Sequence, residues 1–332
     1  MSGLLLGGGL LLLGLVLSLP AIYLVDLPAW VYQGALFRAE VATASATPWS
    51  LQGHPVPNTL STLAPALLLS VTGPVWTGKL LAIGLLAAGF GAAWALANAA
   101  SSSPAETGAR AAILIACAVV SSSFWNGYVG YQVGVVLAMG LGALWLRRER
   151  LSAPLVLVGS VVLFFAHAIP FAVVALAMGV DALRRRDLRQ LVALIPASAL
   201  TAWYVLARLM QPGGGFIEAE TPGGLLRWVA YKVYTVLKVG PFHHPDGVGG
   251  IGTLEALPGL YWLCVIASGL FIAALVAGLA LGTHRMPSGS RRRTTWAAWA
   301  LAGVALLLPP FALNVVNPGE RFLVMAGIGL VA

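Results

Sequence analysis

The sequence predicts an all-α, polytopic membrane protein of about ten transmembrane helices. Hydrophobic residues make up 59% of its 332 residues and charged residues only 9%, and the mean hydropathy is +0.89. Soluble domains carry roughly 25% charged residues. The apolar runs are longer than the ~10-residue strands of a membrane barrel, and a helix satisfies its own backbone hydrogen bonds in lipid. We therefore expect residues 1–332 to form a single transmembrane domain.

The first apolar run, Leu4 to Val25, is expected to be a retained anchor. It has no basic start, and a cleaved signal peptide is the alternative. The last run stops at Ala332 after about ten residues, which is too short to span a bilayer, so we expect the protein to continue. The spans between these two are expected at 75–99, 108–124, 128–146, 153–168, 169–183, 189–209, 258–282 and 295–315, and the last begins at 322.

The distribution of charge predicts the orientation. The segment 59–72 is apolar but only about 14 residues long, so we expect it to lie on the membrane surface. Twelve of the nineteen Lys and Arg then fall on one side with four acidic residues, so that this side holds the whole net charge of +8. The positive-inside rule makes this side cytoplasmic. The basic balance thus indicates topology, and we expect no nucleic-acid partner.

The first outer loop, 26–74, begins with Asp26 at the membrane boundary. Leu27–Ala44 is expected to form an interfacial helix that carries Arg38. Pro28 near the helix start makes Asp26 a candidate N-cap, and a cap fixes where its carboxylate lies. A rigid turn containing His54 and Asn58 follows.

Three further groups of residues are candidates for ligand contact. The turn before the fourth span holds Asn126, Tyr128 and Tyr131, whose donors and rings suit a sugar, although an aromatic belt is the alternative. Lys79 lies at the outer end of the second span. His167 lies at the turn of a hairpin whose arms are short for ~30 Å of hydrocarbon, so it is expected below the outer surface. A histidine hydrogen-bonded to a neighbouring helix is the alternative.

The second large outer loop, 211–257, is expected to contain another interfacial helix at 225–239. His243, His244 and Asp246 follow it. They lack the spacing of helical metal ligands, so substrate contact or an ordered loop is favoured over a metal site, and no cofactor is expected. Glu320 and Arg321 occupy the last outer turn. The Arg321 guanidinium could hold a phosphate in a bidentate pair, whereas a headgroup anchor or a pair with Glu320 is the alternative.

This arrangement resembles the GT-C superfamily of integral-membrane glycosyltransferases. The resemblance is carried by Asp26-Leu27-Pro28 after the first span, Asn58-Thr59-Leu60, Trp125-Asn126-Gly127-Tyr128, the His167 hairpin and Glu320-Arg321-Phe322. It implies inverting transfer of a sugar from a polyprenyl-phosphate donor on the extracytoplasmic face of the cytoplasmic membrane. Asp26 would be the general base, and Arg321, with Lys79, would neutralise the phosphate leaving group.

Two other classes of function fit the same composition. A lipid or small-solute transporter would need polar residues through both leaflets, whereas the polar residues of the expected spans gather near one face. A non-catalytic membrane protein of GT-C type is consistent with Leu27, which stands where relatives often have a second acidic residue.

Overall fold

The computed structural model describes residues 2–20, 24–43, 53–148, 151–210, 224–241, 258–284, 290–308, 311–312 and 315–331. Apart from one two-residue ladder, the regular structure of these residues is helical. The chain divides into two compact units, Met1–Ala112 with Asn126–Met210, and Ile113–Trp125 with Gln211–Ala332. We describe each unit by itself.

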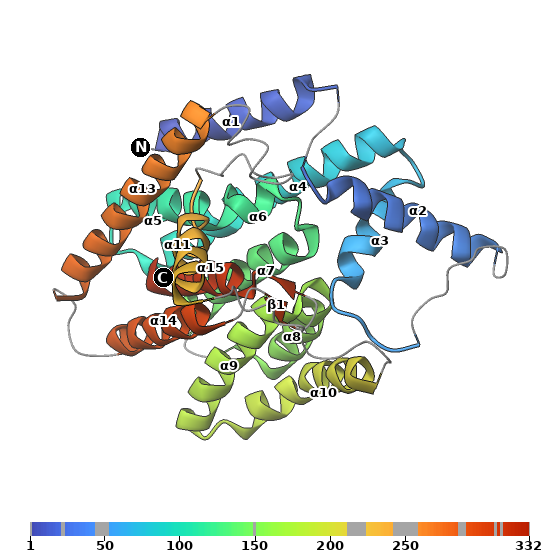
Figure 1. Cartoon of the computed structure of the whole chain (residues 1–332). Helices are drawn as coiled ribbons and strands as arrows, with labels where there is room; N and C mark the ends of the chain where they lie inside the picture. Colours follow the sequence, from blue (N-terminus) through green and yellow to red (C-terminus); the bar gives the residue numbers. More distant parts are fainter. Residues whose placement is uncertain are drawn as a thin grey trace. The chain divides into compact units, whose positions relative to one another are not determined.

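The first unit contains the helices that follow the first apolar run and the hairpin around His167 (Figure 1). The predicted helix after Asp26 is confirmed, and the hairpin turns at His167 as expected. The helices are α1 (Ser2–Ser18), α2 (Leu27–Thr43), α3 (Thr59–Leu68), α4 (Pro74–Ala100), most of α5 (Pro104–Leu114), α7 (Val129–Arg147), α8 (Ala153–Ala166), α9 (Ala168–Arg185) and α10 (Leu188–Met210).

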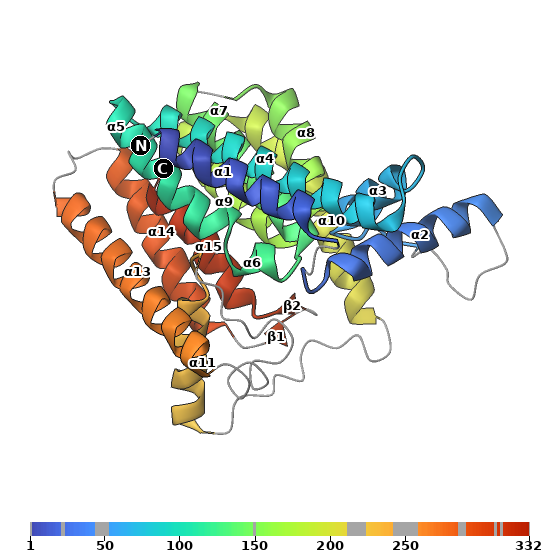
Figure 2. The ribbon, with the colours of Figure 1, turned by 90° about the horizontal axis from the view of Figure 1, so that it is seen from above.

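Helices α2 and α3 lie side by side (Figures 1 and 2). The buried residues of α2 are Leu27, Val31 and Gly34, at the helical spacing that puts them on one face. A Cβ on Gly34 would come within 2.8 Å of the Ala66 backbone nitrogen, so the two helices touch there. The ten residues of α3 extend only ~15 Å, half of the ~30 Å hydrocarbon layer, as expected for a segment that does not cross.

Helices α7 to α10 pack through two apolar clusters. One joins Leu141, Leu163, Phe164, Phe171 and Ala197. The other joins Leu151, Val156, Met178, Ala193 and Leu194. Because lipid is as apolar as leucine, close van der Waals packing rather than escape from water holds such helices together.

The second unit groups the C-terminal helices with the short segment 113–125. The expected continuous helix over 108–124 is interrupted by a π-helical turn, Ile115–Val119, before α6 (Ser122–Trp125). The other elements are α11 (Leu225–Leu237), α13 (Pro258–His284), α14 (Ser290–Leu307), β1 (Phe311–Ala312), β2 (Val315–Val316) and α15 (Pro318–Val331). The two strands pair antiparallel, Phe311 with Val316 and Ala312 with Val315.

Four helices of the described residues are long and apolar enough to cross a membrane: Pro74–Ala100, Val129–Arg147, Leu188–Met210 and Pro258–Ala277. Shorter apolar helices cover Gly7–Ser18, Thr59–Leu68, Ala153–Ala166 and Ala298–Leu307. The chain is thus a helical membrane protein, and the expected number of about ten spans is not confirmed.

The exposed residues of helix α11 are mainly apolar, with Arg227 among them, whereas Lys232 within the helix and Lys238 directly after it are buried. Leu225, Leu226 and Val233 are exposed, whereas Lys232 and Lys238 are buried. An exposed apolar face of this kind suits contact with lipid. The two lysines are therefore held inside the unit, and the expected position of this helix at the membrane interface stays a prediction.

Candidate functional site

Asp26 is fixed against the turn that precedes α7. Its backbone N–H donates to the Asn126 carbonyl at 2.9 Å, and Asp26 itself is partly buried. Gly127 has a φ of +70°. A Cβ there would lie 2.7 Å from the Leu27 nitrogen and 2.9 Å from the Asp26 nitrogen. Glycine is therefore required twice at this turn, for its left-handed backbone and for the close approach of the Asp26 segment.

Asn58 meets the same helix one turn further on. Its φ of 74° is left-handed, a conformation that asparagine tolerates better than most residues. Although Asn58 is at the N-cap position of α3, its side chain makes no capping hydrogen bond. A Cβ on Gly130 would lie 2.6 Å from Asn58 Oδ1 and 2.9 Å from the Ala166 carbonyl oxygen. Asn58 and the end of α8 thus converge on Gly130.

His167 and Tyr131 complete this group. The centroids of their rings lie 5.3 Å apart in an edge-on arrangement, and both side chains are buried. His167 is the N-cap of α9, and its Nδ1 accepts a hydrogen bond from the Ile169 N–H at 3.1 Å. In the neutral ring the proton therefore resides on Nε2.

We call Asp26, Asn58, Asn126, Tyr131 and His167 the α7 cluster. Its members come from separate parts of the chain and gather at the amino-terminal end of α7, in the first unit. From the sequence we predict that Asp26, Asn126 or Tyr128, His167 and Arg321 line one outward-facing cavity. The structure places Asp26, Asn126 and His167 in the first unit and Arg321 in the second, and the shared cavity stays a prediction. Tyr128, directly before α7, is partly buried in the same turn.

Several buried polar atoms of the first unit have no hydrogen-bond partner among the residues that the structure describes. They are Asn58 Oδ1, Asn126 Nδ2 and Gln132 Nε2, and also Trp30 Nε1 and His54 Nε2. The side chains of Asn126 and Gln132 are only 6% and 2% exposed. An unsatisfied buried polar group costs about 1–3 kcal/mol. Such atoms mark where water or a polar ligand binds.

The first unit also shows where three other predicted site residues lie. Lys79 is buried, and its Nζ donates to the Leu17 carbonyl at 3.0 Å, at the carboxyl end of α1. The exposed Arg38 donates to the Leu69 carbonyl at the end of α3. Both are positions where a cation stabilises a helix end. The His54 ring lies 6.2 Å from that of Tyr204.

Glu320 is the centre of a buried network in the second unit. Ser122 Oγ donates to its Oε1, Asn317 Nδ2 donates to Oε2 at 3.1 Å, and Lys238 Nζ lies 3.8 Å from Oε2. The Tyr231 hydroxyl donates to Asn317 Oδ1 at 2.7 Å. Burial raises the pKa of the Tyr231 phenol, which keeps its donor proton. We call these five residues the Glu320 network.

Arg321, beside Glu320, is only 8% exposed and belongs to the same unit. His243, His244 and Asp246 lie outside the described residues. Within the described part of the chain, no three His, Cys, Asp or Glu side chains gather as metal ligands would.

Sequence reasoning missed most of the Glu320 network. Ser122 and Tyr231 lie in helices and Lys238 directly follows one. Helical patterning does not tell which side of an amphipathic segment faces protein and which faces lipid. One signal was present in the sequence: Asn317 precedes Pro318, a pair that favours a turn. Its φ of 47° is left-handed.

None of the protein-family models, curated proteins or solved structures compared with this chain matches it.

Proposed function

We propose that the chain is a membrane glycosyltransferase that moves a sugar from a polyprenyl-phosphate donor to an acceptor hydroxyl. One observation carries the proposal. In the α7 cluster the Asp26 backbone is hydrogen-bonded to Asn126, and the side-chain amides of Asn58 and Asn126 each have one buried atom without a hydrogen-bond partner among the described residues. A sugar presents many hydroxyls, each of which donates and accepts. Such a ligand would satisfy these amides in a way that an apolar ligand would not.

The roles follow from the chemistry of inverting transfer. The acceptor oxygen forms a bond to the anomeric carbon, and the bond from that carbon to the phosphate oxygen breaks, so that the phosphate leaves with the electron pair. Asp26 takes the acceptor's proton as general base. Asn58, Asn126 and Gln132 would hold sugar hydroxyls. A cation would neutralise the leaving phosphate, and the sequence assigns this role to Arg321, which belongs to the second unit.

The hydrogen bond that fixes the His167 ring also suits binding of a sugar oxygen. Because its Nδ1 accepts from Ile169, the neutral ring offers a donor at Nε2. A neutral donor can hold a sugar oxygen without competing with Asp26 for the acceptor's proton.

The purified chain incubated with polyprenyl-phosphate sugars in detergent tests the proposal. Asp26→Asn keeps the size of the side chain but cannot take a proton. We expect it to lower transfer by about 10²–10⁴-fold, the usual effect of removing a general base. Thermal unfolding and donor binding should stay close to those of the wild type. If Asp26→Asn transfers sugar at the wild-type rate, Asp26 is not the general base and the proposal is contradicted.

The Glu320 network favours a second candidate, transport of a lipid or small solute. A buried carboxylate near a lysine and a tyrosine is typical of proton-coupled sites in membrane proteins. Proteoliposomes loaded with candidate solutes separate the two functions. Loss of uptake in Glu320→Gln, with no transfer by the wild type, would favour transport.

A further inference from the structure

Helix α11 turns polar side chains toward the protein and apolar side chains away from it. The buried residues of the helix are Lys232 and Thr235, and Lys238, directly after the helix, is buried as well. Leu226 and Val233 are exposed. An amphipathic helix on a soluble domain has the opposite arrangement, with its apolar face toward the core. The environment outside α11 is therefore expected to be apolar.

Both lysines have partners inside the second unit. Lys232 Nζ donates to the Leu308 carbonyl, after the end of α14. Lys238 Nζ donates to the Tyr234 hydroxyl at 3.2 Å and lies 3.8 Å from Glu320 Oε2. In a helix that lies flat in the membrane interface, basic side chains reach out to headgroups and water. The lysines of α11 do not have this arrangement.

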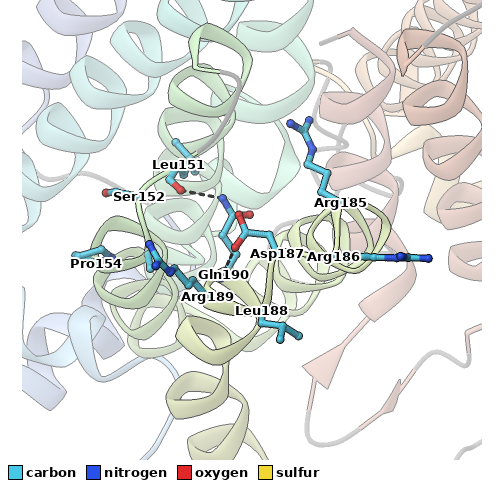
Figure 3. Close-up of a pocket in the computed structure, with 10 residues that line it drawn as sticks. Leu151, Ser152, Pro154, Arg185, Arg186, Asp187, Leu188, Arg189 and Gln190 are labelled. Carbon is cyan, nitrogen blue, oxygen red and sulfur yellow. Dashed lines mark hydrogen bonds between the residues drawn. The ribbon is translucent and has the colours of Figure 1, made fainter.

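The basic residues of the turn between α9 and α10, in the first unit, provide the contrast. This turn borders a cavity of about 670 Å³ (Figure 3). Arg186 and Arg189 are exposed, and Figure 3 shows their side chains extended to opposite sides of the turn. Arginines in such positions can reach water or headgroups. The buried lysines of α11 cannot.

The contact between α11 and α13 indicates how deep α11 reaches. A Cβ on Gly269 would lie 3.8 Å from Leu237 Cδ2, and one on Gly240 would lie 3.0 Å from Phe271 Cδ1. Gly269 and Phe271 belong to Pro258–Ala277, a segment of α13 that is long and apolar enough to cross a membrane. Gly269 is eleven residues after Pro258, or ~17 Å along the helix, which is about half of the ~30 Å hydrocarbon layer. The end of α11 therefore lies level with the middle of this segment.

The length of α11 fits the same depth. Its 13 residues extend ~20 Å, which is enough to reach the middle of the hydrocarbon layer but too short to cross it. Arg227, in the first turn, is exposed and can reach the headgroups from there. The exposed apolar residues of α11 also continue the surface of α13, since only 6% of the apolar segment of α13 is buried.

We propose that α11 is a re-entrant helix that enters the bilayer beside α13 and ends near the middle of the bilayer, with lipid acyl chains against Leu226, Val229 and Val233. It enters from the side that the charge distribution assigns to the outside. The sequence predicts instead a helix that lies flat in the interface. In the re-entrant position Lys238 and Glu320 lie within the hydrocarbon depth, where charged residues face the protein interior and pair with one another.

Spin labels at Leu226 and Val233, introduced one at a time into the full chain in phosphatidylcholine vesicles, test the proposal. The two residues are seven positions apart and therefore lie on the same face of the helix. In a flat helix both labels would lie at the same depth, whereas in a re-entrant helix the Val233 label should lie ~5–10 Å deeper. Collisions with oxygen, which dissolves in hydrocarbon, and with a nickel chelate, which stays in water, measure the depth.

A label at Ile266 is the matched control, because Ile266 is exposed on α13 three residues before Gly269. We expect the labels at Ile266 and Val233 to collide mainly with oxygen. Equal depths at Leu226 and Val233, frequent nickel collisions at Val233, or a water-exposed Ile266 would overturn the proposal. A Val233 label that meets neither reagent would show that protein covers this face, and it would overturn the contact with lipid. Thermal unfolding of each labelled variant checks that the fold is retained.

Discussion

Asn58 Oδ1 lies where a side chain on Gly130 would begin, since a Cβ there would come within 2.6 Å of that oxygen. Residues 72 positions apart in the sequence are therefore in contact at a point that admits only a hydrogen atom. A Cβ on Gly130 would also come within 2.9 Å of the carbonyl oxygen of Ala166, the residue before His167. Gly130 thus sets the spacing between three segments of the α7 cluster.

We predict that Gly130→Ala displaces the Asn58 side chain or the end of α8. Overpacking of this kind costs about 1–3 kcal/mol, so thermal unfolding in detergent should occur at a lower temperature, and ligand binding at the cluster should weaken. Gly140→Ala is the control on the same helix, because nothing lies within 4 Å of a Cβ there. It should be neutral or stabilising by up to about 1 kcal/mol, the helix preference of alanine. Equal behaviour of the two variants would contradict the contact.

The start of α2, the shortness of α3 and the turn at His167 could be predicted because local chemistry determines them. Asp26 and Pro28 mark a helix start, and Pro170, three residues after the N-cap His167, lies in the first turn of α9. The meeting of Asp26 and Asn126 was expected only through a family resemblance. The glycines that permit the meeting carry no local signal of their partners, because a glycine in an apolar helix suits many kinds of packing.

The Glu320 network could not be predicted for a different reason. Lys238 and Ser122 come from separate segments that helical periodicity does not bring together, and a lysine among apolar residues suits a membrane surface equally well. Only the fold decides that Lys238 is buried beside Glu320.

We predict that Glu320 and Lys238 are energetically coupled. Glu320→Gln removes the charge facing Lys238, and breaking a buried pair from one side costs about 3–5 kcal/mol. Lys238→Met should also destabilise, because it leaves the Glu320 carboxylate with only Ser122 and Asn317 as the partners described above. The double variant should lose less than the sum of the two single changes, by about 0.5–3 kcal/mol. Unfolding free energies of the four proteins measure this coupling, and additive losses would exclude it.

The position of α3 predicts the topology of the first loop. A helix of ten residues that packs against α2 does not extend across ~30 Å of hydrocarbon. Single cysteines introduced after Gly53 and after Gly73 should therefore react with a membrane-impermeant thiol reagent from the same, outer side. Wild-type Cys117 and Cys264 are replaced by alanine beforehand. Labelling from opposite sides would reverse the orientation of every later helix.

The last prediction separates two roles of His167 with a pair of substitutions. His167 Nδ1 accepts from the Ile169 N–H at the start of α9, and an asparagine oxygen can take the place of Nδ1 because asparagine is among the best N-caps. His167→Asn should therefore unfold at nearly the wild-type temperature. His167→Ala lacks the acceptor and should lose about 1 kcal/mol of unfolding free energy, the typical cost of removing a cap.

Asparagine, however, does not reach the position of Nε2. If Nε2 holds the sugar donor as proposed, His167→Asn should bind the donor at least about tenfold more weakly, which corresponds to the loss of one hydrogen bond of ~1.4 kcal/mol. Donor binding is measured by titration of the folded protein, and stability by thermal unfolding of the same samples. Unchanged donor binding by His167→Asn would leave His167 with the role of a cap alone.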